Sequence, residues 1–223
     1  SLEQHGKHLP VSTDSIATWL ITTKAAKLAN VPHAPLVWMG FSPQHMRPPG
    51  NGMGTITLRE ETYKNLLLDV GRSLIHHGFN KVVYATGHTS NVKVFDPVLR
   101  LIRYETGALA CLFRADAEAI PPYVTDITEN PPEETPGWHS SELETSCLMA
   151  VHAGLVNMTV AVQDRAHAPR WMGPKFSKRD GTGTVEFRES ENIWVPMEHH
   201  EYSDTAVIGN PFRANAEKGE EIF

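Results

Sequence analysis

The sequence has few cysteines, no long apolar run and no leader segment ahead of its first motif. Only two cysteines occur, Cys111 in an apolar run and Cys147 in a helical pattern, which argues against a disulfide framework and fits a reducing compartment. No apolar stretch reaches the roughly 18 residues that a membrane-spanning helix needs, and no signal peptide is recognisable. We therefore expect a cytoplasmic protein that does not enter a membrane.

The chain also lacks any run of lysine or arginine. Its formal net charge is -6 and its pI is near 6.0, so it offers no electrostatic footprint for nucleic acid or an anionic membrane surface. A small polar or neutral molecule is the expected partner.

At 223 residues with 40% hydrophobic content, the chain can bury a full core. No repeat or low-complexity tract divides it, which predicts a single domain over residues 1–223. The sequence opens on a motif with no strand before it and closes on a polar segment, 217–223, typical of the approach to a helix. We expect this domain to lack its first strand and its last helix.

Short apolar runs alternate with longer helical periods, which predicts an α/β fold with a mostly parallel sheet. The expected helices cover residues 15–30, 59–77, 92–105 and 141–153. The expected strands cover residues 36–39, 81–86, 108–113 and 158–162. Two other stretches, 120–138 and 165–196, are rich in residues that break this pattern, and we expect both to be long loops over a site.

Twelve histidines are spread along the chain, and the first of them belongs to an acidic motif. Glu3 and His5 are two residues apart, so in an extended segment their side chains point the same way and can address neighbouring metal ions. Asp14 follows at the expected start of a helix, where its carboxylate can bridge two cations. It would also be favoured there without any metal, because it complements the helix dipole.

Two further segments carry candidate ligands. His88 comes directly after an expected buried strand, at the edge where parallel sheets place their ligand sites. Glu142 and Glu144 cannot share one face of a helix, so at most one of them reaches the same site. Ser141 and Glu144 also have the spacing of a capping box, which is a purely structural alternative for Glu144. His139 precedes this helix and is free to act as an acid or a base.

Four segments, in order, resemble the creatininase family. The run Glu-x-His-Gly-x-His-Leu-Pro at residues 3–10, with Thr-Asp following, resembles its first signature. Residues 44–58, with Gln44 and His45, are similar to the family's intervening segment. Residues 87–91 resemble its Gly-His-Gly-Gly-Asn element, and residues 139–146 resemble its His-Ala-Gly-x-x-Glu-Thr-Ser element. The resemblance implies a three-layer α/β/α sandwich and a homo-oligomer, often a hexamer. It also implies two metal ions held by Glu3, His5, Asp14 and His88, with Asp14 bridging.

One position departs from the family pattern. In creatinine hydrolases a glutamate two residues after the counterpart of His88 completes the metal site, but this chain has Ser90 there. We expect Glu144 to supply the fifth ligand. The departure favours another activity of the family, such as deformylation of a pyrimidine intermediate, cleavage of a modified precursor peptide, or ring opening of a keto-inositol.

The resemblance and the residues together predict a metal-dependent hydrolase. Two divalent ions, Zn, Mn or Fe, would activate a water that attacks a carbonyl of a cyclic amide, formamide or keto-cyclitol. The expected catalytic residues are His139 and Glu142, and the expected substrate contacts are His45, Ser90, Trp138 and Trp171. Three alternatives stay open: a carbon-carbon hydrolase such as 3-dehydro-scyllo-inosose hydrolase, an isomerase or lyase acting on a keto sugar, and a non-catalytic ligand-binding member.

Overall fold

The computed structural model describes residues 1–48, 54–117, 119–131, 137–173, 175–178, 184–187 and 190–223. Its helices are α1 (Thr13–Ala29), α2 (Glu60–His76), α3 (Thr89–Thr106), α4 (Glu142–His152), α5 (His199–Tyr202) and α6 (Ala216–Ile222). Its strands are β1 (Lys81–Thr86), β2 (Leu109–Arg114), β3 (Phe176–Lys178), β4 (Thr184–Phe187) and β5 (Ser190–Trp194). Short 3₁₀ turns connect several of them.

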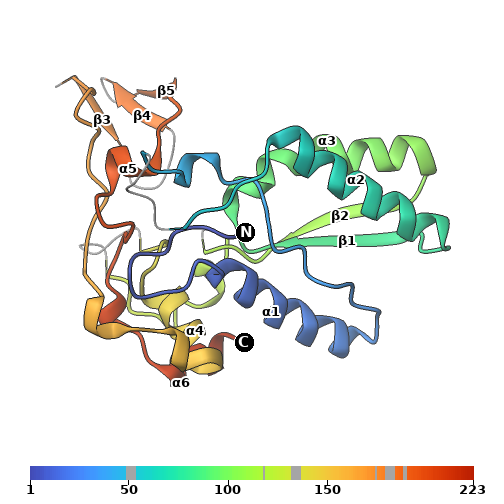
Figure 1. Ribbon diagram of the computed structural model, residues 1–223, viewed down its shortest axis with the longest axis horizontal. Helices are drawn as coiled ribbons and strands as arrows, with labels where there is room; N and C mark the ends of the chain where they lie inside the picture. Colours follow the sequence, from blue (N-terminus) through green and yellow to red (C-terminus); the bar gives the residue numbers. More distant parts are fainter. Residues whose placement is uncertain (49–53, 118, 132–136, 174, 179–183, 188–189) are drawn as a thin grey trace.

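The molecule is built around a parallel pair of strands with helices on both faces (Figure 1). Strand β1 pairs with β2 from Lys81↔Leu109 to Thr86↔Arg114, and α3 forms the crossover between them. Helices α2 and α3 cover one face and α1 lies against the other, which confirms the α/β fold. The main core is made by the buried apolar side chains of α2, α3 and the two strands: Tyr63, Leu67, Leu68, Val82, Tyr84, Val94, Phe95, Val98, Ile102 and Ala110.

The four expected long helices are confirmed, with boundaries that local chemistry explains. Helix α1 carries Asp14 in its first turn and ends at Asn30, which adopts the left-handed conformation. Helix α3 ends at Gly107, also left-handed, and accommodates Pro97 in its interior. The strands expected at 81–86 and 108–113 are confirmed as β1 and β2.

Two expected strands are wrong. Residues 36–39 have no ladder partner among the described residues, and an isolated bridge to Thr57 begins just after them, at Gly40, so the apolar pattern of 36–39 forms no strand. Residues 158–160 form a 3₁₀ turn instead of a strand, because the Asn157 side chain accepts a hydrogen bond from the Thr159 amide and starts the turn.

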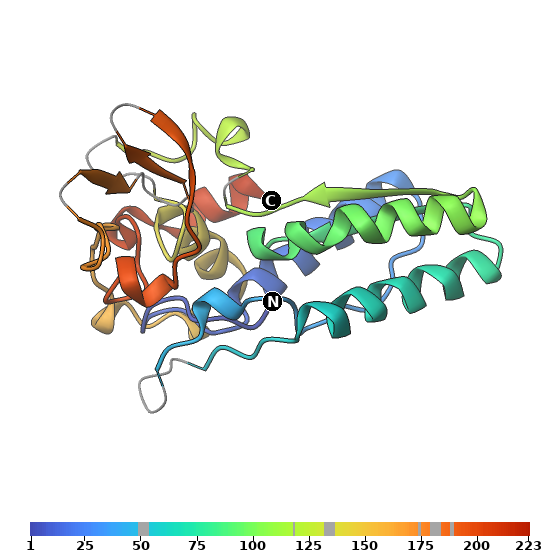
Figure 2. The same cartoon turned by 90° about the horizontal axis from the view of Figure 1, so that it is seen from above.

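Two segments hold more structure than expected. The described part of 165–196 contains the antiparallel sheet β3-β4-β5 and is not simply a loop. The polar segment 217–223 lies mostly within helix α6, which packs on α4. In Figure 2 the long helices and β1-β2 run side by side, while β3-β5, α4, α5 and α6 gather at one end of the molecule. No helix in the described ranges combines the length and apolar character needed to cross a bilayer.

The end of β1 approaches α1 very closely. A Cβ atom at Gly87 would lie 2.3 Å from the Thr18 hydroxyl oxygen and 3.0 Å from the Asp14 carbonyl oxygen. Only glycine fits between the strand and the helix here. The close approach brings His88, the next residue, beside the Asp14 side chain.

Candidate metal centre

Acidic and imidazole side chains from five parts of the chain meet at the end of β1. Besides these five parts, namely the opening segment, the start of α1, the turn after β1, the segment before α4 and α4 itself, the 3₁₀ turn Pro43–His45 and helix α5 each contribute one histidine to the cluster. Its members are Glu3, His5, Asp14, His45, His88, His139, Glu144 and His199, all of them buried except the partly buried Glu144.

His5 is the centre of one group of possible ligand atoms. Its Nε2 lies 3.3 Å from Asp14 Oδ1, 3.5 Å from Glu144 Oε2 and 3.6 Å from Glu3 Oε1. The other ring nitrogen, Nδ1, lies 3.1 Å from the Glu3 carbonyl oxygen, which fixes the ring. The structure therefore brings Glu144, and not only the three residues of the opening motifs, to this group.

His88 is the centre of a second group. Its Nδ1 lies 3.0 Å from Glu3 Oε2 and 3.2 Å from Asp14 Oδ2. His45 Nδ1 lies 2.9 Å from the same Glu3 oxygen. The two oxygens of Asp14 thus face different imidazoles, Oδ1 toward His5 and Oδ2 toward His88.

These distances fit divalent cations. With metal-ligand bonds of about 2.0–2.2 Å, neighbouring ligand atoms around one ion stand about 3.0–3.5 Å apart, as they do in both groups. Three atoms of the cluster, His5 Nε2, His88 Nε2 and Asp14 Oδ2, are buried and have no hydrogen-bond partner in the part of the chain that the structure describes. Mixed carboxylate and imidazole donors suit Zn, Mn or Fe(II). The residues present are therefore a fitting ligand set.

The charges of the cluster are strongly coupled. Burial alone would raise the pKa of the Glu3 carboxyl, but the charges and hydrogen bonds of His45 and His88 hold it well below its usual range. For Asp14, burial and the Glu3 charge oppose ionisation, yet contacts with His5 and His88 lower its pKa to about 2.

The imidazoles show the complementary effect. Burial would lower the pKa of His88, but Glu3 and Asp14 raise it to about 9. The pKa of His5 is raised well above its usual value, because Asp14 and Glu144 outweigh its burial. Divalent cations would supply the positive charge that these buried carboxylates otherwise draw from protonated imidazoles.

His139 and His199 behave differently. Burial, and next the charge of His5, hold the pKa of His139 well below its usual value. Burial and the neighbouring His139 and His45 do the same for the pKa of His199. Both rings are therefore neutral at physiological pH, and His139 Nδ1 lies 3.9 Å from Glu3 Oε1.

A set of hydrogen bonds orients the side chains of the cluster. The Ser42 hydroxyl donates to Glu3 Oε2 at 2.8 Å and lies 2.9 Å from His45 Nδ1. The backbone around Ser42 is held in turn by Asn91, whose Oδ1 accepts the Phe41 amide at 2.8 Å. Such contacts fix the direction of ligand lone pairs.

Glu142, expected as a catalytic residue, is not part of the cluster. Its carboxylate accepts hydrogen bonds from the amides of Glu129 and Asn130 and from Lys218 Nζ. These contacts turn it away from the cluster, as the helical spacing from Glu144 requires. We therefore drop Glu142 from the catalytic set.

The expected substrate contacts fall in three kinds of place. His45 joins the cluster itself, and Ser90 is buried beside it, hydrogen-bonded to the side chain of Gln44. Trp138 lies next to His139, with ring centroids 5.7 Å apart. Trp171 is half-exposed, and its indole N–H donates to Glu201, so the structure does not bring it to the cluster.

Sequence reasoning missed His199. It is fully buried, and its ring lies 4.7 Å from that of His139 and 4.8 Å from that of His45. The available signal was the run Glu-His-His-Glu at 198–201, in which Glu198 and Glu201 form a capping box that starts α5.

The chain is similar in sequence to several known enzymes. Creatinine amidohydrolase from Pseudomonas putida is 28% identical over 185 residues, which cover 78% of this chain and 69% of that protein. A mycofactocin precursor peptide peptidase from Mycobacterium ulcerans is 32% identical, covering 100% of this chain and 77% of that protein. The 3-dehydro-scyllo-inosose hydrolase of Thermotoga maritima is 26% identical, with 99% and 70% covered.

The comparison with solved structures shows a shared fold. A glutamate-to-glutamine variant of creatininase, of Zn-Zn type, superimposes with a TM-score of 0.69 at 23% identity, covering all of this chain and 81% of the other. The creatininase family model, described as creatinine amidohydrolase, matches residues 1–223. The chain therefore belongs to the creatininase family of metal-dependent hydrolases.

Proposed function

We propose that this chain hydrolyses a small polar substrate at a carbonyl carbon with the help of two divalent cations, Zn, Mn or Fe. The observation that carries the proposal is the split of Asp14, whose Oδ1 faces the His5 and Glu144 group and whose Oδ2 faces the His88 and Glu3 group. Each of the two groups would hold one cation, and Asp14 would belong to both groups. When bound, such a pair of cations supplies an activated water and polarises the carbonyl that the water attacks.

His139 is the proposed acid and base. Its Nε2 lies 3.0 Å from the Gln4 carbonyl oxygen, which can only accept, so Nε2 carries the proton and Nδ1 presents the lone pair. Nδ1 faces the carboxylate cluster at Glu3. It would take a proton from the attacking water and pass it to the leaving group.

The substrate class is a cyclic amide, a formamide or a keto-cyclitol. All three offer a carbonyl that an activated water can attack. Ser90 stands where the resemblance expects a glutamate, and its hydroxyl is engaged by Gln44, so Glu144 would complete the ligand set. Because of this departure, ring opening of a keto-inositol is a second candidate beside amide hydrolysis, and the relative from Thermotoga maritima supports it.

The test is elemental analysis before and after chelation, together with hydrolysis of creatinine, a formamidopyrimidine and a keto-inositol. We expect close to two metal ions per chain and loss of turnover on chelation that metal resupply restores. His88→Ala should lose at least one ion, whereas the control His77→Ala, at an exposed position, should keep both. Retention of both ions by His88→Ala would contradict the ligand assignment.

The role of His139 has its own test. His139→Ala should retain the metal content of the parent protein and lower turnover by about 100-fold, a typical contribution of general acid-base catalysis. Unchanged turnover would remove His139 from the mechanism. Loss of a metal ion would make it a ligand instead.

A further inference from the structure

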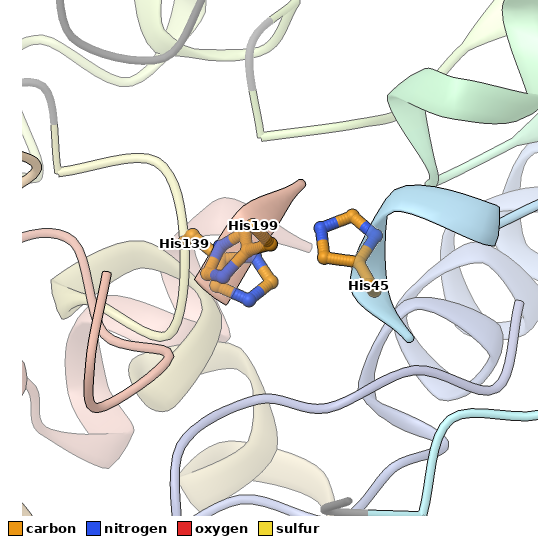
Figure 3. Close-up of side chains that lie close together, drawn as sticks. All are labelled: His45, His139 and His199. Atoms are coloured by element: carbon orange, nitrogen blue, oxygen red, sulfur yellow. The ribbon is translucent and has the colours of Figure 1, made fainter. Parts of the chain in front are cut away.

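Three buried imidazoles face one another beside the proposed metal centre (Figure 3). His45, on the short 3₁₀ turn Pro43–His45, lies opposite His139 and His199, and one nitrogen from each ring lies within 4.8 Å of the others. His45 and His139 are stacked with centroids 5.4 Å apart. Three histidines at this spacing have the composition of a zinc site. The hydrogen bonds around them point to a different role.

The tautomer of His199 follows from a relay that begins at Arg47. Arg47 Nε donates to Gln4 Oε1 at 2.8 Å, and the same guanidinium is anchored by the Ser203 carbonyl oxygen at 3.1 Å. Because a guanidinium can only donate, the oxygen of the Gln4 amide must face it. The Gln4 NH₂ group therefore faces His199 Nδ1, at 3.0 Å.

An NH₂ group donates, so His199 Nδ1 must accept, and the ring proton of neutral His199 lies on Nε2. This Nε2–H is fully buried, and it has no hydrogen-bond partner among the described residues. A protonated nitrogen cannot ligate a metal ion. A buried donor without an acceptor is costly, which indicates that it is kept for a ligand.

Gln4 sets the orientation of two rings at once. Its backbone carbonyl oxygen accepts from His139 Nε2, and its side chain donates to His199 Nδ1. The two histidines consequently present opposite functions, a lone pair on His139 Nδ1 and a proton on His199 Nε2. Both flank the same space as His45.

We propose that His199 is a substrate-binding residue whose Nε2–H donates to an acceptor oxygen, carbonyl or hydroxyl, of the substrate, and that Arg47 and Gln4 position it by fixing its tautomer. The proposal rests on the proposed hydrolase function, and it excludes a third metal ion at the three histidines. It also gives the partly buried Arg47–Gln4 hydrogen bond a role in substrate recognition. His139 and His199 would then contact the substrate from one side, and the metal centre would contact it from the other side.

The first test reads the tautomer directly and needs no substrate. Zinc-loaded protein labelled with ¹⁵N-histidine is measured by long-range ¹H–¹⁵N NMR correlation, and His199→Gln identifies the His199 signals. We expect a neutral ring protonated at Nε2, and loss of this single tautomer in Gln4→Leu. A ring protonated at Nδ1, or a zinc-coordinated His199, would overturn the proposal.

The second test separates a donor from a ligand. His199→Phe should keep the metal content of the parent protein. It should lower kcat/KM about tenfold or more on whichever of creatinine, the formamidopyrimidine or the keto-inositol the parent hydrolyses. His199→Gln retains a donor and should recover part of the lost kcat/KM. Unchanged kcat/KM in His199→Phe, or loss of one metal ion, would overturn the proposal. If the parent hydrolyses none of the three compounds, the proposed function fails by that result, and the tautomer measurement still decides the assignment of His199.

Discussion

Replacing Glu142 and Glu144 by glutamine, one at a time, is expected to separate stability from metal binding on a single helix. Glu142 is 2% exposed, and its carboxylate accepts the Glu129 and Asn130 amides and lies 2.6 Å from Lys218 Nζ. These contacts join the start of α4 to α6 and to the loop before α4. Glu144, two residues later, faces His5 instead.

The expected cost of Glu142→Gln follows from what it leaves behind. Removing one partner of a buried ion pair typically costs about 3–5 kcal/mol, because the other charge stays buried and uncompensated. The cost is smaller here, because the charge of Lys218 is not fully isolated: its side chain is 17% exposed, and its Nζ also lies 2.9 Å from Glu129 Oε1. We therefore expect a loss of about 2–3 kcal/mol. For a domain of this size that corresponds to a fall in Tm of about 4–12 °C.

The assay is thermal unfolding followed by circular dichroism, with elemental analysis of the same samples. Glu142→Gln should lower Tm and keep the metal content and turnover of the parent protein. Glu144→Gln should lose metal, because it removes one charged oxygen ligand. The reasoning is refuted if Glu142→Gln leaves Tm unchanged and loses a metal ion, since Glu142 would then be the ligand.

Two further predictions concern the core. Burial raises the pKa of the Cys147 thiol to about 12, whereas Cys111 is exposed. Iodoacetamide at pH 8 should therefore label one thiol per native chain and both thiols after unfolding. Rapid labelling of both thiols in the native protein would contradict the burial of Cys147. Gly71→Ala should destabilise the fold by about 1–3 kcal/mol in urea unfolding, because the added Cβ would lie 2.2 Å from the Tyr84 hydroxyl and 2.7 Å from Ile102 Cδ1. A stability equal to the parent's would show that α2 can move away from β1 at no cost.

The parts of the fold that sequence predicts well are those with strong local periodicity. Residues 81–86 alternate between buried and exposed or half-buried positions, and α2 and α3 each place their apolar residues on one face. The strand and both helices can therefore be predicted from sequence before any tertiary contact is known. The proximity of Glu3, His5, Asp14 and His88 is also expected from the sequence, because three of them lie in one short segment and His88 follows a strand; their role as metal ligands stays a proposal.

What sequence does not predict depends on distant partners. An apolar run such as 36–39 becomes a strand only if another strand pairs with it, and its own residues do not carry that information. The strands β3 to β5 lie in a segment rich in glycine and charge, where local patterning is weak. His199 contacts Gln4, which is 195 residues away in the sequence, so the local run at 198–201 does not by itself place this histidine in the cluster.

This separation along the chain also bears on the order of events during synthesis. The apolar side chains of the main core all lie between residues 63 and 110, a short span whose contacts can form early. The proposed metal ligands extend from residue 3 to residue 144, so their assembly must wait until residue 144 has left the ribosome, after every residue of the main core. The apolar core can therefore assemble before the proposed ion site is complete, and we expect metal loading to be a late step of maturation and not the nucleus of folding.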